Sequence, residues 1–164
     1  ALEVFALINR SQKDWQYLVV GKGEGDYLKK LKYFAKSLGL GKKIKFWGYV
    51  SEKKKFELLA RSHVMINTSV REGWGLVNIE ANSVGTPVVA YNVAGCKDSV
   101  SEGKSGFLCK MGDINSFSEL AIVLSDNLDR FSFLSQKWAS RFDWKISTQK
   151  STNFIGSLVG KNLS

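Results

Sequence analysis

Short apolar runs alternate with longer amphipathic stretches along much of the chain. The amphipathic stretches carry apolar residues three and four positions apart, as in Leu28, Leu31 and Ala35, which is the spacing of one helical face. The apolar runs are short and rich in β-branched residues, which is typical of buried strands. The pattern predicts strands over 15–20, 44–48, 64–67, 87–91 and 107–108, with helices over 26–38, 51–60 and 76–84.

Residues that cap or end helices stand at the borders of these stretches. Asp26 and Ser51 each come just before or at the start of a helical pattern, where a short polar side chain accepts a hydrogen bond from a free backbone N–H. Gly39 follows one helical pattern and is expected to end that helix.

The C-terminal part is predicted to be mainly helical. A turn at 103–106 and the strand at 107–108 precede two or three helices between 114 and 159. Trp138 and Trp144 are expected to pack in the core. No linker or internal repeat interrupts the pattern, so we expect residues 1–164 to form a single domain.

Repeated strand–helix units predict a doubly wound α/β fold, in which a parallel sheet has helices on both faces. Ligands of such folds bind outside the carboxyl ends of the strands, where loops lead into helices. Four segments are expected at that edge: 21–25, 48–51, 69–75 and 93–97.

A formal net charge of +9, from 24 Lys and Arg against 15 Asp and Glu, suits an anionic partner. Nucleic acid, an acidic membrane surface and a phosphorylated small molecule all fit this charge. A solvated lysine-rich face, with Lys42, Lys43, Lys45 and 53–55, is the more common explanation. A nucleic-acid-binding domain therefore stays open as the weaker alternative. No basic surface interleaved with aromatic residues supports it, so we expect no nucleic acid partner.

Cysteine and histidine usage limits the other classes of site. Cys96 and Cys109 are too few for a disulfide framework; we expect both to be buried, in a reducing compartment. His63 is the single histidine, expected before a strand and partly buried, and we expect no metal site. No run approaches the roughly 20 apolar residues of a membrane span. The first residues do not resemble a signal peptide, and we expect a cytoplasmic location.

The most informative segment is Glu72-Gly-Trp-Gly75, which leads into the helix that begins near Leu76. Glycines at such a turn let the backbone approach a ligand closely. The first free N–H groups of a helix attract an anion such as a phosphate.

Glu80 lies on this helix in the middle of an apolar stripe formed with Leu76, Ile79 and Val84. A carboxylate is rarely buried unless it is paired or accepts hydrogen bonds. Two adjacent sugar hydroxyls would satisfy it at the ligand edge, because each carboxylate oxygen accepts one bond. An ion pair with a lysine or arginine of the fold explains Glu80 equally well.

Glu72, in the loop, is the second carboxylate near this edge. Two acids are also what a glycoside hydrolase uses. We set that reading aside because one acid lies on a helix stripe and the other on an adjacent loop that also offers N–H groups to an anion.

The spacing Glu72-x7-Glu80 resembles the Glu-x7-Glu motif of the family 4 retaining glycosyltransferases, whose GT-B fold consists of two Rossmann-like domains. The resemblance extends in order over nearly the whole chain. The other matching segments are Leu18-Val-Val-Gly-Lys-Gly23, Phe46-Trp-Gly-Tyr-Val-Ser51, Gly85-Thr-Pro-Val-Val-Ala90, Gly95 before Asp98-Ser-Val, Gly103-Lys-Ser-Gly-Phe-Leu108 and Phe142-Asp-Trp144.

This resemblance implies a role for each matching position. Glu72 would be the catalytic-site carboxylate that contacts the donor sugar, and Glu80 would hold the ribose hydroxyls. The remaining donor-sugar contacts would come from Gly73, Trp74 and Gly75. The remaining nucleotide contacts would come from Leu76, Val77, Gly48, Tyr49, Val50, Lys54, Gly21 and Gly23.

The substrate implied is a nucleotide-diphosphate sugar, UDP- or GDP-linked, with no further cofactor and no metal. The chain would be the C-terminal, donor-binding half of the enzyme. The resemblance implies that an N-terminal acceptor domain, and the first strand of this domain with its Arg and Lys, lie outside the chain. We expect this chain alone to be inactive, and a nucleotide-binding module without transfer activity is the alternative. The lysine-rich surface leaves contact with the inner face of a membrane open.

Overall fold

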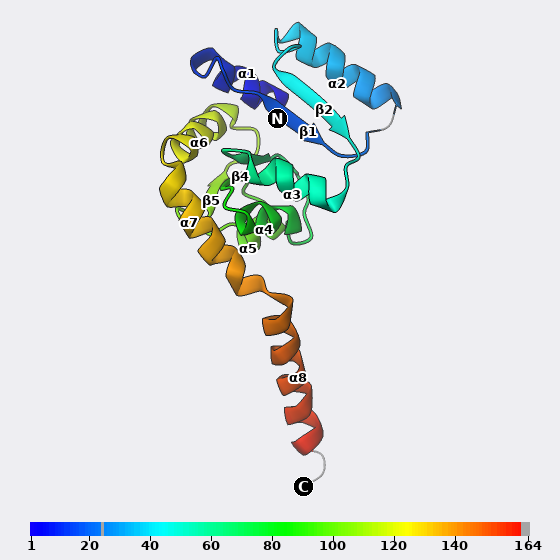
Figure 1. The fold of residues 1–164 in the computed structure, drawn as a ribbon, viewed down its shortest axis with the longest axis vertical. Coiled ribbons are helices and arrows are strands. Elements are labelled where there is room, and N and C mark those ends of the chain that lie inside the picture. Colours follow the sequence, from blue (N-terminus) through cyan, green and yellow to red (C-terminus); the bar gives the residue numbers. More distant parts are fainter. Residues whose placement is uncertain (24, 162–164) are drawn as a thin grey trace.

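The computed structural model describes residues 1–23 and 25–161, in which helices and parallel strands alternate (Figure 1). One short 3-10 helix, η1, joins the last two α-helices. The elements in order are α1 (Leu2–Ser11), β1 (Tyr17–Val20), α2 (Gly25–Ser37), β2 (Ile44–Gly48), α3 (Glu52–Ala60), β3 (Met65–Asn67), α4 (Leu76–Ser83), β4 (Val88–Tyr91), α5 (Ala94–Ser99), β5 (Gly106–Cys109), α6 (Ile114–Asp126), α7 (Leu128–Ala139), η1 (Ser140–Phe142) and α8 (Trp144–Lys161).

Most of the predicted helix ends are confirmed. Ser51 is the N-cap of α3, where its hydroxyl oxygen accepts from the N–H of Lys54 at 3.3 Å. Gly39 follows α2 with a φ of 73°, a left-handed conformation that suits glycine. The prediction for Asp26 is wrong. Because α2 already begins at Gly25, Asp26 lies in the first turn and pairs with Lys29 instead.

The segment 93–97 also differs from its predicted structure. It was predicted as a loop, but it contains most of α5, a helix of six residues. So short a helix shows no full helical period, and its glycine is unfavourable in a helix interior. Its position is set by packing, because Cys96 and Ser99 are buried against the rest of the fold.

Two parallel sheets carry the fold, one of β1 and β2 and one in the order β3-β4-β5. Alternate residues of β4 enter two different clusters. Val89 and Tyr91 pack with α1 and α6, whereas Val88 and Ala90 pack with residues of α4 and α5. Since successive side chains of a strand point to opposite faces, this sheet has helices on both faces. The predicted α/β class is confirmed.

Between β1 and β3 the predicted sheet is not continuous. In Figure 1, β1 lies on the side of β2 that faces the second sheet. The rings of Trp15 and His63, which precede β1 and β3, are stacked with centroids 6.1 Å apart. Within the described residues, β1 pairs only with β2, and β3 pairs only with β4. His63 is exposed, so the expectation that it is partly buried is wrong.

The last helix extends away from the rest of the molecule (Figure 1). Trp144, at its start, is 81% exposed, so the prediction that it packs in the core is wrong. Trp138 is half-buried and lies edge-on to Phe142. No described helix is both long enough and apolar enough to cross a membrane.

Candidate functional site

The loops that follow the strands lie at the carboxyl edges of the two sheets, as the strand pattern predicts. Gly48 ends β2 with a φ of 67° and accepts a backbone hydrogen bond from Gly21, which follows β1, at 2.9 Å. The segment 68–75 leaves β3 and enters α4 at Gly75. In the segment 21–25, residue Glu24 lies outside the described residues.

Residues 72–75, which we call the donor loop after the donor-sugar contacts that the resemblance implies for them, lie directly against the start of α5. A Cβ atom on Gly95 would stand 2.6 Å from the Glu72 carbonyl oxygen and 2.8 Å from the Trp74 nitrogen. Only a glycine allows backbone to approach backbone this closely. Gly95 therefore sets the position of the donor loop, a role that the sequence analysis did not assign to it.

Gly75 is constrained in two ways. Its φ of 74° lies in the left-handed region, and a Cβ there would meet the Ser99 hydroxyl at 2.6 Å and the Asn78 amide nitrogen at 2.8 Å. As the N-cap of α4 it offers no side chain. The N–H groups of Leu76 and Val77 therefore have no capping side chain from Gly75, and the first N–H groups of a helix have no intrahelical partner.

A buried chain of polar groups holds the donor loop from beneath. Asn67 donates to Asn78 at 2.9 Å, and Asn78 donates to the Ser99 hydroxyl at 2.9 Å. The Ser99 hydroxyl donates to the Gly95 carbonyl, and the Trp138 indole donates to the Ser99 carbonyl. Because all these groups are paired, the network rigidly joins β3, α4, α5 and α7. The sequence could have indicated this network, because Asn78 is a polar residue in the middle of a helix that packs inward.

Glu72 is half-buried and lines a cavity of about 440 Å³. Its carboxylate has no ion pair within the described part of the chain. Burial raises the pKa of the nearby Cys96 thiol, and the negative charge of Glu72 raises it further. The cavity is lined by Val70, Arg71, Glu72, Gly73, Val93 and Ala94.

Trp74 packs against η1, the 3-10 helix that follows α7. Its side chain is 37% exposed, and its ring lies edge-on to Phe142 with centroids 5.1 Å apart. Phe142 in turn contacts Trp138, again at 5.1 Å. An aromatic row therefore connects the donor loop to the point where α8 begins.

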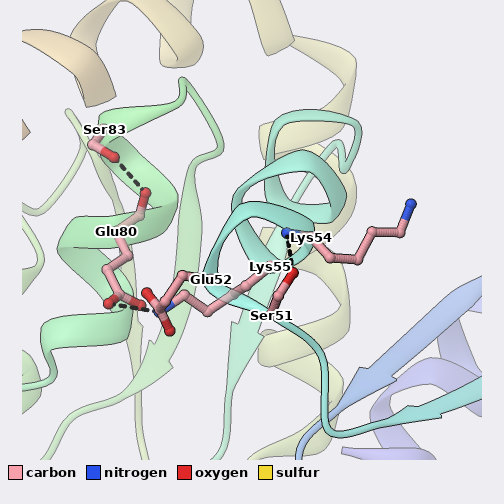
Figure 2. Close-up of polar contacts among 6 residues, drawn as sticks. All are labelled: Ser51, Glu52, Lys54, Lys55, Glu80 and Ser83. Atoms are coloured by element: carbon pink, nitrogen blue, oxygen red, sulfur yellow. Dashed lines mark hydrogen bonds and ion pairs between the residues drawn. The ribbon is translucent and has the colours of Figure 1, made fainter.

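Glu80 forms an ion pair with Lys55 of α3, with 2.9 Å between Oε1 and Nζ (Figure 2). The same ammonium lies 2.9 Å from the carboxylate of Glu52. Burial of Lys55 disfavours its charged form, but its bonds to Glu80 and Glu52 outweigh that effect and raise the Lys55 pKa. The alternative of a lysine partner is thus realised in this structure, and Lys55 is a residue that the sequence analysis missed.

Lys54 is not brought to Glu80. Its ammonium lies 2.7 Å from Glu57 and 5.2 Å from the centroid of the Trp47 ring. Figure 2 shows the two neighbouring lysines pointing to different sides of α3. Adjacent helical residues are about 100° apart around the axis, so only one of them can face α4.

The glycines after β1 and β2 lie in a different place from the donor loop. Gly21, Gly23 and Gly48 line a cavity of about 650 Å³ between the strand ends and α2. Tyr49 is 81% exposed and Val50 is half-buried. The predicted site residues therefore fall into two groups, and neither cavity includes residues of both.

The predicted apolar stripe of α4 is partly wrong. Ile79 is buried, but Leu76 is 56% exposed. The other buried positions are Asn78, Ala81 and Asn82. Asn78 is bonded to Asn67 and Ser99, and Asn82 donates to the carbonyls of Thr86 and Ser105. Leu76 is the first residue of α4 and follows the N-cap Gly75 at the end of the loop from β3.

Metal-binding side chains and cysteines are the remaining candidate groups of the site. Within residues 1–23 and 25–161, no group of three or more His, Cys, Asp or Glu side chains is placed to hold a metal ion. Cys96 and Cys109 are free and buried, as predicted.

Comparison with known proteins agrees with the arrangement of strands and helices. A family model described as "Glycosyl transferases group 1" matches residues 1–133. The chain belongs to the group 1 glycosyl transferases. Its architecture is that of the C-terminal half of a GT-B glycosyltransferase.

Curated relatives of this group 1 chain are bacterial enzymes. The D-inositol 3-phosphate glycosyltransferase of Corynebacterium urealyticum is 29% identical over 147 residues, which are 86% of this chain and 35% of the relative. The N-acetyl-alpha-D-glucosaminyl L-malate synthase of Bacillus anthracis is 31% identical over 114 residues, 70% of this chain and 29% of the relative. The chain thus spans about a third of the length of these relatives.

Solved glycosyltransferase structures share the fold. Anabaena HepE in complex with UDP is 26% identical, with a TM-score of 0.84 over 95% of this chain and 44% of that one. A second HepE structure contains UDP-glucose and has a TM-score of 0.81 at 27% identity. Sucrose-phosphate synthase from Thermosynechococcus elongatus, at 21% identity and a TM-score of 0.83 over 97% of this chain and 42% of that one, shares the fold alone.

Proposed function

We propose that this chain binds a nucleotide-diphosphate sugar at its sheet edge and, within a longer protein, serves to transfer the sugar to an acceptor with retention of configuration. The observation that carries the proposal is the donor loop. It is fixed by Gly95 and Asn78, and it leads into a helix whose N-cap offers no side chain. A fixed backbone with free N–H groups suits a diphosphate, because the groups need not reorganise when it binds.

The two carboxylates have distinct parts in this proposal. Glu72, half-buried beside its cavity and without an ion pair among the described residues, would contact the donor sugar. Glu80 would accept from the ribose hydroxyls. The nucleotide base would lie against 48–51. UDP and UDP-glucose occupy the HepE structures, which supports a UDP-linked donor here over a GDP-linked one.

We propose that no metal ion and no further cofactor take part. The diphosphate charge would then be met by backbone N–H groups and by basic side chains. The lysine-rich composition of the chain, at +9 overall, supports this assignment.

A further proposal concerns the parts that would complete the enzyme. The sheet is interrupted between β1 and β3, and each of these strands has one unpaired edge in the described structure. We propose that a strand preceding α1 fills this position and that residues 1–164 then act as one donor domain. The exposed apolar side chains of α8, among them Trp144 and Phe154, suit contact with an acceptor domain.

The location of the reaction is also proposed here. The two free buried cysteines support a reducing, cytoplasmic compartment. The net positive charge supports contact with the inner face of an anionic membrane.

Titration with UDP, GDP, ADP and their sugar conjugates tests the proposal, with backbone-amide NMR to locate binding. We expect UDP to shift amides of 48–51 and 73–80. In Glu80→Gln we expect affinity to fall about 10- to 100-fold, because a hydrogen bond to a charged group contributes about 1.5–3 kcal/mol.

Glu57→Gln is the matched control, since Glu57 is also a carboxylate paired with a lysine of α3, but on its exposed side. We expect that variant to bind UDP normally. Equal affinities for wild type and Glu80→Gln would remove Glu80 from the site. Shifts scattered over the lysine-rich face and abolished by salt would favour non-specific anion binding instead.

A further inference from the structure

The two lysines 54 and 55 have opposite environments although they are neighbours in sequence. Both lie on α3, and each pairs with a glutamate of that helix at a spacing of three residues. Lys55 alone also reaches another helix, through Glu80 of α4 (Figure 2). The Lys55 and Glu80 side chains are 23% and 20% exposed, so the pair is largely shielded from water.

The ion pair occupies only one oxygen of Glu80. Lys55 Nζ donates to Oε1 at 2.9 Å. Ser83, which also contacts Glu80, donates to its backbone carbonyl and not to its carboxylate. Within the described residues no group donates to Oε2, so that oxygen can still accept a bond from a ligand.

The second carboxylate on Lys55 limits how freely the lysine can move. Glu52, 77% exposed, lies 2.9 Å from the same ammonium and belongs to the first turn of α3. A lysine held by two carboxylates from two helices loses little additional rotamer freedom when a ligand arrives. Together the three charges sum to −1, whereas the two carboxylates alone would present −2 to an anionic ligand.

We propose that Lys55 is a positioning residue for the ribose of the nucleotide, which it serves by fixing the Glu80 carboxylate with Oε2 turned outward. This inference rests on the proposed function. A hydroxyl of the ribose would donate to Oε2 while Lys55 stays on Oε1. A carboxylate fixed in this way binds a hydroxyl better than a freely rotating one, because less conformational entropy is lost on binding.

Preference for ribose over deoxyribose follows from this arrangement. A nucleotide without the bonded hydroxyl leaves Oε2 unpaired in a partly buried place, which costs affinity. If Glu80 is no longer held, it can rotate towards water, and the loss of the hydroxyl then costs less. Lys55 should therefore affect discrimination between UDP and 2′-deoxy- or 3′-deoxy-UDP, and a purely structural role of Lys55 would not.

The test measures the affinity of the chain for UDP and for both deoxy nucleotides by calorimetry. In Lys55→Met we expect UDP to bind about 10-fold more weakly, and the preference for UDP over the more discriminated deoxy nucleotide to shrink about 5- to 10-fold. Lys55→Arg should restore most of both, since it keeps the charge. Lys29→Met is the control and should change neither quantity, because Lys29 also pairs with a carboxylate three residues away, Asp26, but does so on the exposed surface of α2.

Each outcome decides between the proposals. Loss of UDP binding in Glu80→Gln, with unchanged affinity and unchanged discrimination in Lys55→Met, would overturn this inference alone. Tighter UDP binding in Lys55→Met would also overturn it, because Lys55 would then compete with the ribose for Glu80. Absence of UDP binding by the unaltered chain would count against the proposed function and this inference together.

Discussion

At the scale of single residues, the site depends on places where a side chain cannot fit. The donor loop rests on Gly95, and the atoms that a Cβ there would meet belong to the backbone of Glu72, Gly73 and Trp74. Backbone atoms cannot rotate away as the end of a flexible side chain can. The loop would have to move as a whole, together with the network that anchors it.

We predict that Gly95→Ala lowers the free energy of unfolding by about 1–3 kcal/mol, the usual cost of overpacking. It should also weaken UDP binding, because the donor loop is displaced. Urea unfolding and calorimetry measure the two effects. Gly41→Ala is the control, since a Cβ there meets nothing within 4 Å. Unchanged stability of Gly95→Ala would mean that the loop moves freely over α5.

The resemblance implies Lys54 as a nucleotide contact, and the residue pattern left open which lysine or arginine would pair with Glu80. The structure places Lys55 on Glu80. A run of three lysines on one helix has no apolar or glycine marker that fixes which one faces inward. The facing is decided by the rotation of α3 against α4, and therefore by packing. The role of either lysine in binding stays a prediction until it is measured.

At the scale of elements, the start of a helix is predicted best where the capping side chain itself accepts a hydrogen bond from a free backbone N–H. Ser51 was predicted correctly for α3. Asp113 caps α6 in the same way. The hydroxyl of Ser116 donates to it at 2.7 Å and the Ser116 N–H at 3.1 Å. These bonds hold the Asp113 pKa below its ordinary value of 3.8.

This lowered pKa predicts a pH dependence with a definite sign. The charged form of Asp113 is favoured in the folded state, so its contribution is complete well above pH 3.8 and is lost as the pH falls through the lower folded value. We expect wild type to be more stable than Asp113→Asn at pH 6, and the difference to shrink towards pH 3. Urea unfolding at several pH values measures it. A constant difference between the two proteins over this range would contradict the assignment.

The short helix α5 shows where element prediction fails. Its six residues include a glycine and do not complete the two turns needed to show a period. Tertiary packing decides its conformation, because Cys96 and Ser99 are buried and Ser99 is bonded to Asn78 and Trp138. A segment of this kind has no local conformational preference strong enough to predict its structure from the sequence.

At the scale of the whole molecule, the last helix contributes little to the described core. Every described side chain of α8 from Trp144 to Leu158 is exposed. In contrast, α7 buries Phe131, Ser135 and Ala139. The core therefore ends with α7 and η1.

We predict that a chain ending at Asp143 keeps its free energy of unfolding within about 1 kcal/mol of the full chain, since the removed side chains are exposed. It should also self-associate less, because exposed Trp144 and Phe154 are gone. Urea unfolding and light scattering measure these changes. A chain ending at Asn127 is the control and should not fold. A large loss of stability in the first truncation would show that α8 folds back onto the core.

The sequence alone determined the α/β class, the order of the five strands and the family, and it singled out Glu72 and Glu80 as candidate site residues. These features depend on patterns that repeat locally, such as the periods of strands and helices, or on residues at fixed spacing in one segment. Such a pattern can be recognised within one segment of the sequence, without knowledge of how the rest of the chain folds.

Only the tertiary structure decided which lysine meets Glu80, that Gly95 and Asn78 support the donor loop, and that the sheet is divided between β1 and β3. Each of these is a contact between residues distant along the chain. Such contacts depend on how helices rotate and approach one another during packing, and no single segment carries that information.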